Sequence, residues 1–474
     1  MLMRKFVCAV LFLVGLSGLS FAKGTSKPAV TPKAGVTSEQ QADRYLIPGM
    51  VEDLYAMLPK KKTWEKFHWG LEERIRQEYY KNALFLSKHE ENRNYFRFRT
   101  RMWFKADPWK WFSAYLRLTN ECRAWMQHNP HDADMDEIFF DNIYVDIKRP
   151  FDLPVSVRFG RQDFIYGKGF VLFDGTPLDG SRSNYTDGIK ATLHLDDLKT
   201  NIDALIMENN RHDRKFFRFN PTHHAMLEDE SRMFGYYITS KYFDDIKLEQ
   251  YYLYKAANGQ PLSGNNYSQN EKLHTFGGKI SGTLLKDFEY DSELAVQFGK
   301  DGREHRRGLG AYVTGKYNIP VTSLKPWVMA GYFYTSGDDP DTDRIEAWDP
   351  LNGRWPGQHD AEILLLTRAT EDGVAYVTNT HKLRIGTGFC PVPWWSISLF
   401  YDHLEADECP KIYNRGRLFG DGKVRGEMFQ GISKWNLAKN VSAYVKYEVM
   451  APGSYYYDSA DTAMFLKWEL NIKY

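Results

Sequence analysis

Apolar and hydrophilic residues alternate one by one through the last segment of the chain. Even positions from 464 to 474 hold Met, Leu, Trp, Leu, Ile and Tyr, whereas the odd positions hold mostly Lys, Glu and Asn. Successive side chains of a β-strand point to opposite faces, so this pattern predicts a strand with one apolar and one hydrophilic face. The chain also ends on an aromatic residue, Tyr474, as outer-membrane β-barrels commonly do. A soluble β-sandwich has no reason to end in this way.

The same alternation recurs along the whole chain, most clearly in residues 96–105, 112–119, 189–195 and 441–449. The mean hydropathy is −0.54 and 26% of the residues are charged, yet 15% are aromatic. A transmembrane barrel reconciles these values, because half of its strand residues face lipid and half face water. Beyond the N-terminus, no apolar run reaches the roughly 20 residues that a membrane-spanning helix needs.

Connections between the alternating segments are short and long in turn. The short ones, expected at the periplasmic rim, are residues 106–109, 196–198, 243–245, 286–287, 390–393 and 436–439. The long ones, expected outside the cell, are residues 80–93, 127–136, 167–186, 209–232, 258–272, 337–379, 405–423 and 451–460. This arrangement predicts an all-β fold: a transmembrane antiparallel β-barrel of about 18 strands with both termini on the periplasmic side.

The N-terminus carries the features of a secretory signal. Two basic residues precede an apolar run over residues 6–19, and small residues follow up to Ala22, where we expect cleavage. The predicted organisation is a signal peptide at 1–22, a periplasmic leader segment at 23–66 and the barrel at 67–474, located in a Gram-negative outer membrane. Residues 50–58 fit either a short amphipathic helix over the periplasmic mouth or a flexible leader.

A barrel of this size encloses an aqueous lumen that side chains cannot fill. Placing the polar face of each strand inward assigns about 16 basic and about 6 acidic residues to the lumen and leaves most carboxylates to the loops. A lumen rich in cations favours the passage of anions. The basic residues assigned to it include Arg97, Arg99, Arg101, Arg117, Arg123, Arg158, Lys190, Lys316, Arg384, Arg425, Lys446 and Lys467.

Two further blocks of sequence stand out. The first comprises Gly160-Arg161-Gln162, Tyr166-Gly167 and residues 183–188, and the second comprises residues 336–340, 348–351 and Trp355-Pro356. In this order, from about residue 68 to the end, they resemble the alginate-export porin family. The resemblance implies a monomeric barrel whose Arg- and Lys-lined lumen passes an anionic polysaccharide outward, and it adds Arg161, Asp163 and Asp187 to the lumen residues. Strict alternation would aim Arg161 and Asp163 at lipid, so we expect a bulge at Gly160 that turns Arg161 inward.

These features indicate an outer-membrane pore that exports an anionic exopolysaccharide such as alginate, through guanidinium groups that bind successive carboxylates weakly. The alternatives are a general anion-selective porin and a surface-binding barrel that uses the aromatic-rich loops around 209–232 and 345–356. A barrel enzyme is disfavoured, because the sequence holds no nucleophile-elbow motif. Expected partners are the anionic polysaccharide or small anions, outer-membrane lipid and lipopolysaccharide, and periplasmic export machinery. We expect a monomer, no cofactor and no nucleic acid.

Acidic and histidine-rich segments raise the question of metal binding. Asp339, Asp341 and Asp343 are weak candidates for a divalent cation, because their spacing lacks the glycine of a calcium loop. Residues 128–137 and 212–224 also gather carboxylates and histidines, without the cysteines or regular spacing of a zinc site. A solvated loop explains all three segments better than a metal site does.

Three cysteines follow the predicted signal peptide. Topology places Cys390 at the periplasmic rim and Cys409 in an outer loop, so these two cannot form a disulfide. Cys122 and Cys409 both lie toward the outer side and are the one pair that the topology allows.

Overall fold

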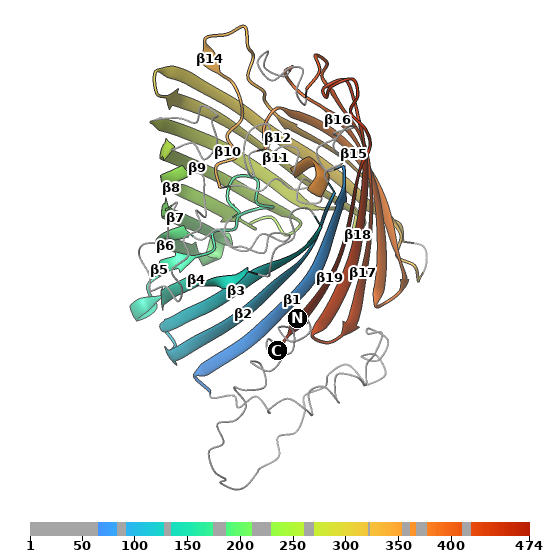
Figure 1. Cartoon of the computed structure of the whole chain (residues 1–474). Helices are drawn as coiled ribbons and strands as arrows, with labels where there is room; N and C mark the ends of the chain where they lie inside the picture. The colour runs from blue at the N-terminus through green and yellow to red at the C-terminus, as the bar shows by residue number, and fades with distance from the viewer. Residues whose placement is uncertain are drawn as a thin grey trace.

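The chain folds into a closed ring of antiparallel strands (Figure 1). The computed structural model describes residues 65–82, 92–127, 134–173, 186–210, 229–259, 270–320, 323–352, 361–365, 377–409 and 419–474. Each of the 18 long strands pairs with the next, and pairing of β1 (Phe67–Lys81) with β19 (Ala463–Lys473) closes the barrel. The predicted fold class is therefore confirmed. Within the described residues, no helix has the length and apolar character needed to cross a membrane.

The remaining elements follow one another around the ring. They are β2 (Arg93–Trp109), β3 (Phe112–Gln127), β4 (Asp134–Lys148), η2 (Pro150–Asp152), β5 (Val155–Gln162), β6 (Thr186–Leu195), η3 (Asp196–Leu198), β7 (Thr200–Asn209), β8 (Asp229–Ser240), β9 (Ile246–Gly259), β10 (Glu271–Leu284), β11 (Phe288–Asp301), β12 (Glu304–Asn318), β13 (Trp327–Thr335), β14 (Arg344–Ile345), β15 (Thr380–Val392), β16 (Trp395–Glu405), β17 (Val424–Ala438) and β18 (Val441–Pro452). The two-residue β14 is not a barrel strand, because it pairs in parallel with β12 from within the long connection that follows β13.

Short connections join the strands at one rim and long connections at the other, as predicted. The start of β1 and the end of β19 lie at the short-turn rim (Figure 1). Three short turns differ from their predicted positions because the strands extend further: Trp109 still pairs with Phe112, Val392 with Trp395, and Ala438 with Val441. The outer connection between β11 and β12 is also only two residues long, which the sequence pattern did not predict.

The apolar positions of the alternating pattern face outward. In β19, Leu466 and Trp468 expose 42% and 36% of their surface, whereas Phe465 exposes none and Lys467 only 1%. The same contrast holds at β17, where Phe429 is 58% exposed. These exposed apolar side chains form the lipid-facing belt that a membrane barrel requires, and the inner face carries the polar set.

The predicted bulge at Gly160 is wrong in form. The register of β5 against β4 and β6 runs unbroken through Gly160, and the extra residue is instead Asp141, in the neighbouring strand β4. Gly160 has a φ of +126°, which a side chain rarely tolerates, and a Cβ there would lie 2.4 Å from the carbonyl oxygen of Ile143. Arg161 is nevertheless buried, with 1% of its surface exposed.

Replacing Gly160 with Ala should destabilise the barrel by about 1–3 kcal/mol, the typical cost of a side chain held in a disfavoured backbone conformation. The measurement is the temperature at which the folded, fast-migrating form is lost in semi-native electrophoresis. Gly278→Ala is the matched control, because the nearest atom to its Cβ would be at an ordinary 3.5 Å. Equal transition temperatures for both variants would contradict the strain assigned to Gly160.

None of the three cysteines among the described residues forms a disulfide. A disulfide between Cys122 and Cys409, which the topology allowed, is therefore wrong: Cys122 is buried within β3, and the thiol of Cys409 lies 3.3 Å from the carbonyl oxygen of Asp421. The predicted signal peptide, almost all of the leader segment with its possible helix at 50–58, and the histidine cluster at 212–224 lie outside the described residues.

Candidate functional site in the barrel lumen

Arginine side chains crowd the inner face of three neighbouring strands. Cross-strand register brings them together: Arg74 lies opposite Arg99, and Arg97 lies between Arg76 and Arg123. Every second residue of a strand faces the lumen, so each strand contributes its basic side chains to the same side. We call this group the arginine array; its members are Arg74, Arg76, Arg97, Arg99, Arg101, Arg117 and Arg123.

Within the described residues, six carboxylates contact the arginine array: Glu72, Glu78, Glu121, Asp141, Asp163 and Glu469. The nitrogen-to-oxygen distances run from 2.5 Å for Arg99–Glu72 to 3.9 Å for Arg74–Glu469. Seven guanidinium groups against six carboxylates leave this wall with a surplus of one positive charge. Two donor atoms of Arg99, Nε and Nη1, are buried and make no hydrogen bond to any residue that the structure describes.

The other predicted lumen residues of this side lie on or beside β4, β5 and β6. Their contacts are Arg158–Asp146 (2.6 Å), Arg161–Asp187 (2.9 Å), Arg117–Asp163 (3.4 Å) and Asn142–Asp163 (2.9 Å). Lys190 lies opposite Arg158 across the β5–β6 pair. Apart from Lys316, Arg384, Arg425, Lys446 and Lys467, the predicted lumen residues therefore gather on or beside β2 to β6. Arg384 lies elsewhere on the wall, in β15, where it contacts Asp402 at 2.6 Å.

Carboxylates line a second sector, the inner face of β9 to β12. Its charged members are Lys255, Lys279, Arg306, Glu249, Glu271, Asp291 and Glu293, all buried. Tyrosines add hydrogen bonds, as where the hydroxyl of Tyr251 donates to Glu293 at 2.9 Å. The predicted large excess of basic over acidic lumen residues is therefore wrong for the described inner face as a whole. Buried charges need partners of opposite sign, and the positive surplus is found at the arginine array.

The connection between β13 and β15 folds into the barrel. Trp348 stacks on Phe170 of the segment 163–173 that follows β5, with ring centroids 5.2 Å apart. Both pack in one buried cluster against the inner faces of β7 to β13. Asp349 then accepts a hydrogen bond from Lys255 at 2.9 Å and lies 3.7 Å from Arg306. Burial acts to raise the pKa of Asp349, but Lys255 and Arg306 lower it overall, so the carboxylate stays charged.

The same connection reaches the opposite wall with residues 361–365. The backbone N–H groups of Glu362 and Ile363 both donate to the carboxylate of Glu448, each at 3.1 Å. The carboxylate of Glu362 pairs with Lys467, next to the arginine array. Apolar side chains of this segment pack with residues of β1, β2 and β16 to β19. The inserted connection therefore contacts both sides of the lumen and narrows it.

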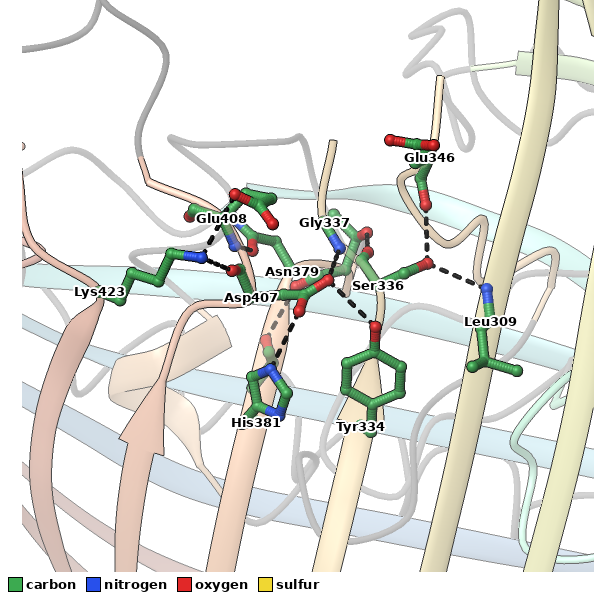
Figure 2. A network of polar contacts seen from close by, with 12 residues as sticks. Leu309, Tyr334, Ser336, Gly337, Glu346, Asn379, His381, Asp407, Glu408 and Lys423 are labelled. Carbon is green, nitrogen blue, oxygen red and sulfur yellow. Dashed lines mark hydrogen bonds and ion pairs between the residues drawn. The ribbon is translucent and has the colours of Figure 1, made fainter. Parts of the chain in front are cut away.

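Figure 2 shows how the base of the inserted connection is fixed at the outer rim. The carboxylate of Asp407 accepts hydrogen bonds from the backbone N–H of Gly337 at 2.8 Å and from the hydroxyl of Tyr334 at 3.1 Å. The hydroxyl of Ser336 donates to the carbonyl oxygen of Glu346 at 2.7 Å. These bonds set the direction in which the chain leaves β13.

Sequence reasoning missed Arg74 and Arg76, as well as the carboxylates that contact the arginine array other than Asp163. The alternation of polar and apolar residues in 71–79 was a usable signal for both arginines. The weak metal candidates Asp339, Asp341 and Asp343 form no metal site, since the described residues contain no group of three suitable ligands. Instead, Asp339 accepts a hydrogen bond from the backbone N–H of Asp341 at 2.9 Å.

Comparison with known proteins gives one family match. Residues 66–467 match the family described as "Alginate export". A search of curated proteins found no match.

Several solved structures share the fold. The outer membrane protein OpdK from Pseudomonas aeruginosa superposes with a TM-score of 0.54 at 8% identity, covering 86% of this chain and 98% of that chain. OccK2 (OpdF) from Pseudomonas aeruginosa, solved in complex with glucuronate, gives 0.52 at 10% identity, covering 87% and 99%. At these identities the likeness shows the fold alone.

Proposed function

The chain belongs to the alginate export family and forms an outer-membrane barrel channel, and from this premise we propose that it passes an anionic polysaccharide along the arginine array. The observation that carries the proposal is the surplus of guanidinium groups on β1 to β3. Guanidinium groups bind carboxylates through two parallel hydrogen bonds, which suits a polymer that carries a carboxylate on each sugar. The proposal includes that the barrel acts as a pore and not as an enzyme.

The carboxylates beside the arginine array keep binding weak. Each incoming carboxylate has to compete with Glu72, Glu121 or Asp141 for guanidinium donors. A site that binds too tightly would hold the polymer, whereas a series of weak sites lets it move from one to the next.

The inserted connection supports a selective pore over a wide one. It contacts the wall at Lys255 on one side and at Lys467 on the other, so solute has to pass beside it. A cargo that threads as an extended chain fits such a narrowed lumen better than a compact one of the same mass. Partners at the periplasmic mouth and a monomeric state are parts of the same proposal.

A second candidate is a pore for small carboxylates. One observation favours it: the similarly folded OccK2 was solved in complex with glucuronate, a single uronate sugar. Both candidates use the arginine array, and they differ in the length of the cargo.

Single-channel recording in a planar bilayer under a salt gradient tests the proposal. We expect the sign of the reversal potential to show that the pore prefers anions over cations. We also expect oligomannuronate to block the current, and longer oligomers to block it more strongly, because longer chains reach more guanidinium groups. Block by glucuronate of equal strength would favour the small-carboxylate pore. Cation preference, or the absence of any current, would overturn both candidates.

A further inference from the structure

A basic pocket of about 560 Å³ lies at the outer ends of β10, β11 and β12, beside β14. It is lined by Lys272, His274, Phe298, Gly299, Lys300, His305, Arg306, Arg307 and Arg344. The side chain of Arg306 contacts Glu271 on the inner face and is not counted among the pocket's cations. Three of its cations come from barrel strands, and Arg344 comes from β14. The function proposed above uses none of these residues.

The pocket opens on the outer face of the barrel. In β12, Arg306 points inward to Glu271 and Asp349, so its neighbours His305 and Arg307 point away from the lumen. The burial pattern agrees: Lys272 and Lys300 are exposed, and the residues before and after Lys272 are buried. The pocket is therefore separate from the arginine array and faces the membrane side of the wall.

No carboxylate lines this pocket. The acidic residue at the end of β10, Glu271, belongs to the inner face and contacts Lys255 and Arg306 there. Arg344 lies 3.8 Å from Asp343, whose side chain is 97% exposed. Within the described residues, no ion pair involves Lys272, Lys300 or Arg307. Three permanent cations, Lys272, Lys300 and Arg307, are thus gathered without an ion-pair partner among the described residues.

Aromatic residues mark the depth of the pocket in the membrane. The ring of His274 stacks on Phe298, with centroids 5.2 Å apart and planes at 9°, and Tyr254 adjoins His274 at 4.8 Å. Apolar side chains continue below them along the same strands, with Phe276 and Val296 exposed by 48% and 41%. Aromatic girdles lie at the membrane interfaces of outer-membrane barrels. The cations beyond the rings therefore lie at the height of the outer-leaflet headgroups.

We propose that this pocket binds the phosphorylated headgroup of an outer-leaflet glycolipid, the lipid A part of lipopolysaccharide. A phosphate at this height meets Lys272, Lys300 and Arg307, while the acyl chains of the same molecule lie along Phe276 and its apolar neighbours. A soluble anion would use the cations but not the apolar belt. Pairing of β14 with β12 brings Arg344 to the pocket, so the bound headgroup also holds the base of the inserted connection.

The test measures binding of purified, folded protein in detergent to diphosphorylated lipid A and to the same lipid without phosphates. The triple variant Lys272→Gln, Lys300→Gln, Arg307→Gln should bind diphosphorylated lipid A roughly 100-fold more weakly. The three basic residues are expected to contribute comparable shares of this combined effect, as basic residues near an anionic lipid surface do. Dephosphorylated lipid should bind wild type and variant equally weakly. The folded, fast-migrating form in semi-native electrophoresis shows that the variant barrel is intact.

The matched control removes three exposed lysines from the opposite rim: Lys241→Gln, Lys286→Gln, Lys325→Gln. This control should bind lipid A as the wild type does. Arg344→Gln, which changes no barrel strand, should weaken binding on its own. The proposal is overturned if the first triple variant keeps wild-type affinity, if the control loses as much affinity, or if inorganic pyrophosphate binds as tightly as diphosphorylated lipid A.

Discussion

Replacing Arg99 and Arg101 together with Ala should remove most of the anion preference of the pore and weaken its block by oligomannuronate. Each charged hydrogen bond that is lost contributes about 1.5–3 kcal/mol, so the affinity of the blocker should fall by at least about tenfold. Both residues lie at the centre of the arginine array, buried to 4% and 5% exposure. Reversal potentials and the concentration dependence of block are the measurements.

The loss of anion preference should be larger than the removal of two positive charges alone would cause, because the carboxylates that paired with these arginines remain in the lumen. Glu72 loses Arg99 at 2.5 Å, and Asp141 loses Arg101 at 3.4 Å. The surplus of positive charge on this wall then becomes a deficit. The double variant Arg99→Lys, Arg101→Lys separates the effect of charge from that of hydrogen-bond geometry. It should keep the reversal potential of the wild type but lose part of the block by oligomannuronate, because an ammonium group cannot bind a carboxylate through two parallel hydrogen bonds.

Arg232→Ala is the matched control for this pair. Its side chain is 80% exposed and pairs with Glu208 on the outer face of the barrel, away from the lumen. It should leave selectivity and block unchanged. If the Arg99, Arg101 double variant also retained the anion preference of the wild type, the arginine array would not be the selectivity determinant.

The strands could be predicted from sequence because each one carries its own signal. Alternation at Leu466, Lys467 and Trp468 assigns both faces of β19 without knowledge of any neighbour, and the structure has the same faces. Gly160 shows the limit of this reasoning. The sequence indicated a break in the regular alternation at Gly160, but the bulge lies in the neighbouring strand β4, at Asp141. The position of a bulge depends on how two strands pair, and the sequence of one strand alone does not reveal that pairing.

The net charge of the lumen was harder to predict than which side chains face the lumen. Parity identified Arg97 and Arg99 as inward, yet their net effect depends on Glu78 and Glu72, which lie diagonally across from them in β1 and form ion pairs with them. The path of the inserted connection was not predictable either. Loops have no periodicity, and Trp348 and Asp349 were noticed only as part of a family signature. Their contacts include residues more than 90 positions away, as between Asp349 and Lys255.

Replacing Asp349 with Ala should release the inserted connection from the β9 to β12 wall and raise the conductance of the pore. Asp349 is 1% exposed and contacts Lys255 and Arg306, while its backbone carbonyl accepts a hydrogen bond from Gln297 at 2.7 Å. Removing one partner of a buried ion pair costs about 3–5 kcal/mol, because the remaining charges stay buried without compensation. Such a change moves the balance toward the undocked connection by at least about a hundredfold.

Two measurements separate undocking from a general loss of fold. Single-channel conductance should rise, and trypsin should cleave after Arg344 faster than in the wild type while the barrel keeps its fast-migrating form in electrophoresis. Asp341→Ala is the matched control on the same connection, because that side chain is exposed and is not adjacent to the cleavage site, so it should change neither result. Faster cleavage with unchanged conductance would mean that the connection undocks but does not limit flow. The narrowest point would then lie at the arginine array itself, where Arg97 and Arg117 are the side chains to change next.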